Sequence, residues 1–176
     1  AISLLVVLGN LVAIFGLDTI FLDDQVRYTF AVENFFPWYI AKENFFRPFF
    51  LFPLYKLMQI SPYLARGVQV LCFMVPLSFS FYILYRRVFG LPIILALSAS
   101  VIPNILPAQE LIPAFIDGSY TVQGLLATNI SILLAAKYVD GEDEKYRYLF
   151  ASIIGYIFAV EMVLHAIFLL VPILVL

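Results

Sequence analysis

The stretch that decides the fold is Ser61–Arg87, with the sequence SPYLARGVQVLCFMVPLSFSFYILYRR. Its part from 62 to 85 is apolar and long enough to cross the hydrocarbon core of a bilayer, which takes about 20 residues of α-helix. Ser61 followed by Pro62 is a typical helix start, with a capping side chain and a proline in the first turn. Arg86 and Arg87 then supply charges that end the helix. The sequence therefore predicts a membrane-spanning helix over 62–85.

Outward from this stretch the chain stays apolar. Hydrophobic residues make up 64% of the 176 residues, charged residues only 12%, and the mean hydropathy is +1.01. A soluble domain is about half apolar and a quarter charged, so much of this surface must face lipid. The net charge of −2 excludes a basic surface for nucleic acid.

We expect an all-α fold, a polytopic transmembrane helical bundle. The further predicted spans are about 2–22, 91–108, 121–138, 146–160 and 162–176.

The two ends of the chain indicate a fragment. The sequence begins at Ala1 without Met, inside one apolar run, and stops at Leu176 inside another. We therefore expect residues 1–176 to be a single transmembrane domain, the N-terminal part of a longer protein. Its single cysteine, Cys72, excludes a disulfide framework or a cysteine-based metal site within the chain.

Basic residues predict the orientation of the spans. Lys and Arg concentrate in cytoplasmic loops. They occur here at Arg86 and Arg87, and again at Lys137, Lys145 and Arg147. Both groups are cytoplasmic if the second and fourth spans run from outside to inside. The loops around 23–61 and around 117 are then external.

The first external loop is unusually aromatic. Aromatic rings with polar neighbours favour the level of the lipid headgroups. The segments 24–35 and 49–59 are too short and too flanked by charge to span, so we expect two interfacial helices lying along the outer leaflet. Pro48 and Pro53 argue against a long straight helix there. The alternative is an ordinary external loop.

Asp23 and Asp24 directly follow the first predicted span. Two adjacent carboxylates at a membrane surface repel each other, and low dielectric makes it costly to ionise both. Such a pair suits a base that deprotonates an acceptor hydroxyl, or a site for a cationic ligand. The alternative is that the two charges simply end the helix at the water interface.

The order of short motifs along the chain resembles that of the GT-C superfamily of membrane glycosyltransferases, and most closely the protein O-mannosyltransferases and related bacterial polytopic glycosyltransferases. The resemblance is carried by four segments: DDQVRY at 23–28, NFFRPF at 44–49, LYRRVFG at 84–90 and PAQE at 107–110. It covers nearly the whole chain, although each motif is short and degenerate.

The resemblance implies a catalytic base at Asp23 or Asp24 and a polyprenyl-phosphate sugar as donor, with no further cofactor. An acceptor hydroxyl would attack the anomeric carbon as the lipid phosphate leaves, and cationic groups would stabilise that phosphate. Arg47 and Arg27 are the nearest candidates because the guanidinium matches phosphate geometry. Their alternative role is to reach the lipid headgroups from the interface.

Further acidic residues extend the candidate site. The resemblance implies that acidic residues of the second external loop, here Glu110 and Asp117, help to bind substrate. The alternative is a solvated loop.

Glu161 and His165 are four residues apart, hence on one helical face, inside an apolar segment where ionisable groups are functional unless paired. They can also pair with each other, which is the structural alternative. Relatives often place a Lys here, whereas Val160 precedes Glu161 in this chain. A single His is not a metal site.

Three hypotheses for function follow. The first is a glycosyltransferase that moves a sugar from a polyprenyl-phosphate donor to an acceptor hydroxyl at the non-cytoplasmic face. The second is a non-catalytic structural or accessory subunit of a membrane complex, which the missing Lys favours. The third is an ion-coupled transporter. All three predict a multi-pass protein of the plasma, inner or endoplasmic reticulum membrane. Its partners would be membrane lipids, a polyprenyl-phosphate sugar or other membrane subunits, and not nucleic acid.

Overall fold

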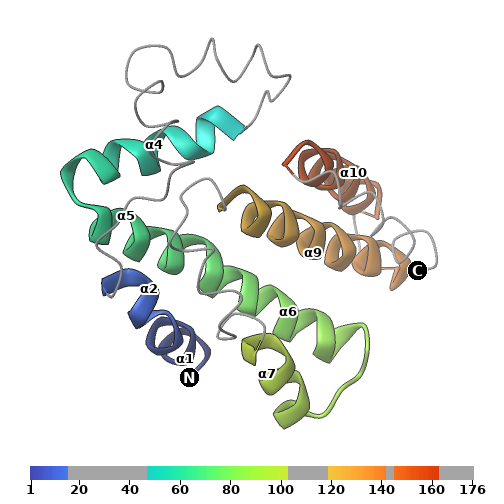
Figure 1. Ribbon diagram of the computed structural model, residues 1–176. Coiled ribbons are helices and arrows are strands. Elements are labelled where there is room, and N and C mark those ends of the chain that lie inside the picture. The colour runs from blue at the N-terminus through green and yellow to red at the C-terminus, as the bar shows by residue number, and fades with distance from the viewer. Residues whose placement is uncertain (16–46, 103–118, 142–144, 163–176) are drawn as a thin grey trace.

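The computed structural model describes residues 1–15, 47–102, 119–141 and 145–162. Within these ranges every regular element is a helix and no strand occurs, which agrees with the predicted all-α class. The elements are, in chain order, α1 (Ile2–Gly9), α2 (Leu11–Phe15), α4 (Arg47–Ile60), α5 (Pro62–Gln69), the π-helical turn η1 (Val70–Met74), α6 (Val75–Arg87), α7 (Ile93–Val101), α9 (Ser119–Val139) and α10 (Lys145–Met162) (Figure 1).

Helices α5, η1 and α6 follow one another without a break and form the predicted long helix, which runs from Pro62 to Arg87. The hydroxyl oxygen of Ser61 accepts a hydrogen bond from the Leu64 amide at 3.4 Å and caps the helix start. Pro62 occupies the first turn, where no amide donor is needed. At the other end the chain turns through Gly90, whose φ of 64° is strained for residues with a Cβ. The predicted start and end of this helix are confirmed.

The π-helical turn η1 lies where a proline enters the long helix. The amide of Val75 donates to the carbonyl of Val70, five residues back, instead of four. Pro76 follows in the first turn of α6 and has no amide hydrogen to donate. A proline inside an α-helix removes one hydrogen bond and crowds the carbonyl four residues before it. A wider turn just before the proline relieves that crowding, and such turns are frequent at functional sites.

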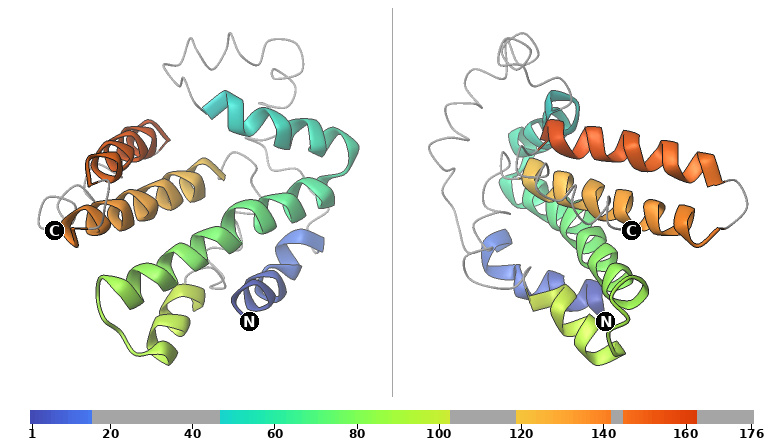
Figure 2. Two further views of the ribbon diagram at one scale, coloured as in Figure 1. Left: turned by 180° about the vertical axis from the view of Figure 1, so that it is seen from behind. Right: turned by 90° about the vertical axis from the view of Figure 1, so that its right-hand side faces the viewer.

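Helices α9 and α10 form an antiparallel hairpin, and the two lie side by side in the front and side views (Figures 1 and 2). The Ser152 hydroxyl donates to the carbonyl of Ser131 at 2.8 Å and joins the two helices. Gly155 allows the close approach, because a Cβ at this position would lie 2.6 Å from the Ser131 hydroxyl oxygen. The hairpin covers the predicted segments 121–138 and 146–160. Its second helix continues to Met162, past the break predicted near Glu161.

Helix α6 connects the hairpin to the rest of the molecule. The Asn129 side-chain amide donates to the Ser80 hydroxyl oxygen at 3.0 Å, in a buried position between α9 and α6. Arg87 and Lys137, at the ends of these two helices, line one small hollow, so α6 and α9 run in the same direction, as predicted. An apolar cluster at the centre of the molecule joins Ile2, Val6, Ile14, Val70, Met74, Leu77, Val101 and Val122.

Helix α4 packs against α5 and forms a second apolar cluster, made of Leu51, Leu54, Tyr55, Met58 and Ala65. At 14 residues it is about 21 Å long, short of the roughly 30 Å hydrocarbon thickness. It contains the segment 49–59 that we expected as an interfacial helix. Pro48 and Pro53 were expected to prevent a long straight helix here. Helix α4 contains both prolines and ends at Ile60 after 14 residues.

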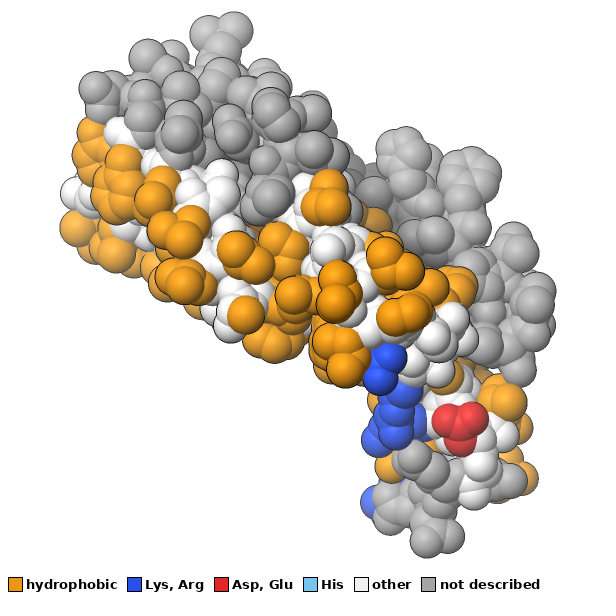
Figure 3. All heavy atoms as spheres, turned by 90° about the horizontal axis from the view of Figure 1, so that it is seen from below, with side chains coloured by type: hydrophobic (Ala, Val, Ile, Leu, Met, Phe, Trp, Pro, Cys, Tyr) orange, Lys and Arg blue, Asp and Glu red, His pale blue; other side chains and the backbone are white. Residues whose placement is uncertain are grey.

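Two helices are long and apolar enough to cross a membrane, judged by length and composition: Pro62–Arg87 and Thr121–Val139. Helix α7 covers 93–101 of the predicted span 91–108, of which 103–108 lie outside the described residues. The predicted span 2–22 is described only to Phe15. The predicted interfacial helix 24–35 and residues 163–176 of the last predicted span lie outside the described residues. Many large apolar side chains are exposed on the described residues, including Ile94 at 76% and Phe150 at 67%. Figure 3 shows apolar side chains spread over one face of the molecule.

Candidate functional site

Most of the site residues predicted from the sequence fall outside the described part of the chain. These are Asp23, Asp24, Arg27, Glu110, Asp117 and His165. Of the remaining two, Arg47 is the first residue of α4, and Glu161 lies partly buried in the last turn of α10. The structure therefore leaves the predicted acidic pair and the predicted pair of Glu161 with His165 as expectations.

The described residues instead place a buried cation in the long helix. Arg66 lies in the second turn of α5 and is only 2% exposed. Gln69, one turn further along and on the same helical face, is fully buried. A guanidinium is expensive to hold away from water, and ionisable groups inside apolar helices face the protein interior and mark functional sites. Arg66 and Gln69 thus form the most polar part of an otherwise apolar helix.

Gln123 is a third buried polar residue, in the second turn of α9. Its side chain is 4% exposed, and neither atom of its amide has a hydrogen-bond partner within the described residues. A buried amide without partners costs about 1–3 kcal/mol. A ligand that brings a hydrogen-bonding group to this position would recover that cost.

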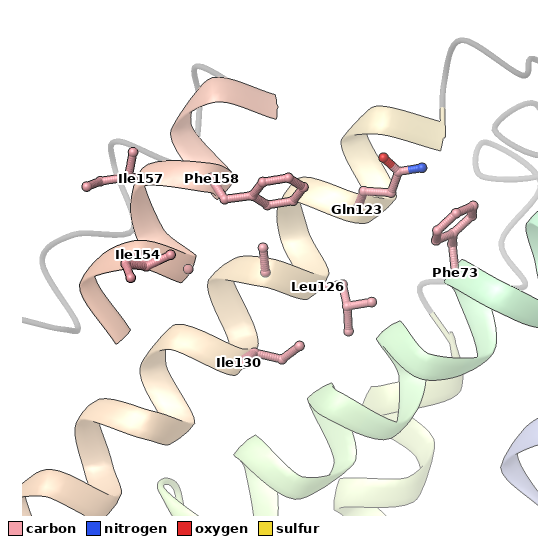
Figure 4. A pocket seen from close by; sticks show the side chains of 9 residues that line it. Phe73, Gln123, Leu126, Ile130, Ile154, Ile157 and Phe158 are labelled. Carbon is pink, nitrogen blue, oxygen red and sulfur yellow. The ribbon is translucent and has the colours of Figure 1, made fainter. Parts of the chain in front are cut away.

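Gln123 lines a groove between η1, α9 and α10, with a volume of about 550 Å³. The groove is otherwise apolar; its remaining lining is Phe73, Leu126, Ala127, Ile130, Ile154, Gly155, Ile157 and Phe158. In Figure 4, Gln123 and Phe158 lie at one end and Ile130 lies toward the other. Phe73 belongs to η1, the turn that directly follows Gln69, and its side chain lines the groove. The groove is suited to a hydrocarbon chain, with its polar contact at one end.

Some other buried polar side chains bond to the backbone one turn before them. The Thr128 hydroxyl donates to the Gly124 carbonyl at 2.9 Å, and the Asn10 side-chain amide donates to the Val6 carbonyl at 2.8 Å. Bonds of this kind satisfy a buried donor within its own helix. Within the described ranges, no group of three or more His, Cys, Asp or Glu side chains is placed to hold a metal ion.

The sequence reasoning missed Arg66, Gln69 and Gln123. A signal for Arg66 was available, because it is a charge five residues into a segment predicted to span a membrane. Gln69 is a second polar residue in the same segment, three positions later and therefore on the same helical face. Gln123 carries no such signal, since a single Gln near the start of an apolar helix is as often at the water interface as buried.

Comparison with known proteins gives no match to a family model, to a curated protein or to a solved structure.

Proposed function

We propose that the chain is the membrane-embedded part of a multi-pass glycosyltransferase. It transfers a sugar from a polyprenyl-phosphate donor to an acceptor hydroxyl at the non-cytoplasmic face. The motif order at 23–28, 44–49, 84–90 and 107–110 supports this assignment, as does the presence of two helices able to cross a membrane.

The observation that carries the proposal is Arg66. It is a cation held at 2% exposure inside the Pro62–Arg87 helix, where a charge is retained only at a cost. A phosphate is the ligand that a guanidinium matches best, through two parallel hydrogen bonds. In this proposal Arg66 takes the role that the sequence suggested for Arg27 and Arg47, or shares it with them. Gln69 adds hydrogen-bonding capacity one turn further along.

The apolar groove suits the lipid part of the donor. A polyprenyl chain needs a hydrocarbon-lined path, and the groove of about 550 Å³ beside Phe73 offers one, with the buried Gln123 in its lining.

The reaction itself needs one base and one leaving group. The acceptor oxygen forms a bond to the anomeric carbon, the bond from that carbon to the phosphate oxygen breaks, and polyprenyl phosphate leaves with the electron pair. The carboxylate of Asp23 or Asp24 takes the hydroxyl proton.

The decisive experiment replaces both aspartates at once. Asp23→Asn with Asp24→Asn removes either candidate base, and we expect transfer from a panel of polyprenyl-phosphate hexoses to fall by about 10²–10⁴-fold. Lys56→Gln on α4 serves as the control. Lys56 is exposed, its amine donates to the Gln59 side-chain oxygen at 3.4 Å, and it lies 5.5 Å from the centre of the Phe52 ring. Undiminished transfer in the double variant overturns the catalytic role.

A second measurement distinguishes the proposed enzyme from a non-catalytic accessory subunit. The absence of a Lys before Glu161 favours that alternative. Saturable binding of polyprenyl phosphate by the purified chain, measured by tryptophan or tyrosine fluorescence, supports the enzyme. An accessory subunit shows none.

A further inference from the structure

The ends of α6 and α9 form a small polar hollow that the proposed transfer reaction does not use. Its volume is about 170 Å³. The charged side chains that line it are Arg87 from the last turn of α6, and Lys137 and Asp140 from the end of α9. The Arg and Lys side chains gather at one end of the described surface, beside an acidic one (Figure 3).

This hollow lies at the level where the two candidate spans end. Arg87 is the last residue of the Pro62–Arg87 helix, and Lys137 lies two residues before the end of Thr121–Val139. Apolar side chains complete the lining: Val88, Leu133, Ala136 and Val139. Cations beside apolar side chains at the end of a membrane span typically lie at the boundary between the acyl chains and the lipid headgroups.

The charged side chains that line the hollow favour an anionic ligand. They are two cations and one carboxylate, with a net charge of +1 among the three, and the Lys137 amine also lies 5.1 Å from the centre of the Tyr148 ring. Arg and Lys both bind phosphate oxygens, and Asp140 can accept a hydrogen bond from a hydroxyl. The volume equals that of about six waters in the liquid, which is enough for a phosphate and part of its alcohol.

We propose that this hollow binds the headgroup of an anionic glycerophospholipid that carries a hydroxyl, of the phosphatidylglycerol type. Arg87 and Lys137 hold the phosphate, Asp140 accepts from the headgroup hydroxyl, and the apolar wall contacts the start of the acyl chains. The inference rests on the membrane location proposed above but not on the sugar-transfer chemistry.

The test uses the full chain in nanodiscs made of phosphatidylcholine and phosphatidylglycerol with identical acyl chains. Native mass spectrometry then reports which lipids the protein retains. We expect the wild type to be enriched in phosphatidylglycerol. In the variant Arg87→Gln with Lys137→Gln, we expect the enrichment to fall by about fivefold for each cation removed, until no preference remains.

Arg147→Gln is the matched control. Arg147 is exposed in the first turn of α10, just after the α9–α10 turn, and does not line the hollow. If enrichment depends on the hollow, Arg147→Gln retains it. An equal loss in Arg147→Gln and in either single variant of Arg87 or Lys137 shows diffuse attraction to a positive surface and overturns the proposal.

Asp140 gives a second, independent readout. Phosphatidylethanol carries the same phosphodiester without a headgroup hydroxyl. We expect the wild type to prefer phosphatidylglycerol over phosphatidylethanol, and Asp140→Asn to weaken that preference while still retaining anionic lipid. Equal retention of the two lipids by the wild type overturns the role of Asp140. Loss of sugar transfer with lipid retention intact contradicts only the proposed reaction, whereas a chain that stays in water without detergent contradicts both proposals.

Discussion

The two halves of the long helix, α5 and α6, both contain arginine, but in opposite environments. In the first half, Arg66 is 2% exposed beside the fully buried Gln69, and α4 packs against the same half. In the second half, Arg86 and Arg87 are exposed at the helix end, where the Arg86 guanidinium donates to the Leu91 carbonyl at 2.6 Å. A cation at a helix C-terminus is favoured by the helix dipole and by water. A cation inside is retained only when something else requires it.

The comparison shows that position, and not residue type, sets the environment of each arginine. Arg87 lies exposed at a helix end, where the helix dipole favours a cation. Arg66 is buried within the helix, and in the function proposed above its guanidinium binds phosphate.

The strongest test of this contrast exchanges each arginine for glutamine in the full protein. We expect Arg66→Gln to lower kcat for sugar transfer by about 10²–10³-fold, the effect of losing one group that stabilises developing charge. Arg87→Gln should change kcat by less than about twofold. Steady-state kinetics with a polyprenyl-phosphate sugar measures both.

Arg66→Lys keeps this test informative if the glutamine variant folds poorly. Lysine retains the charge but not the paired hydrogen bonds, so we expect partial activity. Full activity in a folded Arg66→Gln protein would remove Arg66 from the site, and equal losses at both positions would contradict the contrast.

The second test concerns how closely each half is packed. Gly155 of α10 lies against α9, which packs on the second half, and an added Cβ would meet the Ser131 hydroxyl oxygen at 2.6 Å. We expect Gly155→Ala to lower the free energy of unfolding by about 1–3 kcal/mol, the usual cost of overpacking. Thermal unfolding in detergent measures this loss.

Gly67 in the first half provides the matched control, because nothing lies within 4 Å of a Cβ built there. We expect Gly67→Ala to raise the free energy of unfolding by up to about 1 kcal/mol, since alanine restricts the unfolded chain and favours the helix. Destabilisation of similar size at both glycines would mean that the two halves are equally closely packed.

The smallest expected effects come from two serines, one in each half. Ser61→Ala removes the cap of α5 and should cost about 1 kcal/mol. Ser80→Ala removes the hydroxyl that accepts from the Asn129 side-chain amide and should cost about 0.6 kcal/mol, typical of a hydrogen bond between membrane helices. Urea or detergent titration of unfolding orders the two. If Ser80→Ala lowered the free energy of unfolding clearly more than Ser61→Ala, this order would be wrong. The polar contact of the second half would then contribute more to stability than the cap of the first.

The sequence predicted the helices that have clear local signals. Ser61 with Pro62 and Arg86 with Arg87 mark the ends of the long helix, and the apolar run 121–138 matches α9 to within a few residues. The expected helix 49–59 lies within α4, although local propensity disfavours Pro53 inside a helix.

The candidate site was less predictable. Span prediction averages hydropathy over about 20 residues, so a single Arg66 changes the average little and its burial cannot be seen. Gln123 and the groove depend on three helices meeting at Phe73, a contact between segments some 50 residues apart that no local pattern encodes. The predicted acidic residues stay predictions.

The π-helical turn at Val70–Met74 has a consequence for how the long helix tolerates change in length. Such a turn holds one residue more than an α-helical turn, so the helix can lose one residue there and become regular α-helix. Deleting one residue within it leaves a continuous α-helix whose two halves still face the same neighbours, although Pro76 then crowds the carbonyl four residues before it. The same deletion within α6 would rotate everything beyond it by about 100° and turn Arg87 away from Lys137. Evolution could therefore shorten this helix at one place and not at another.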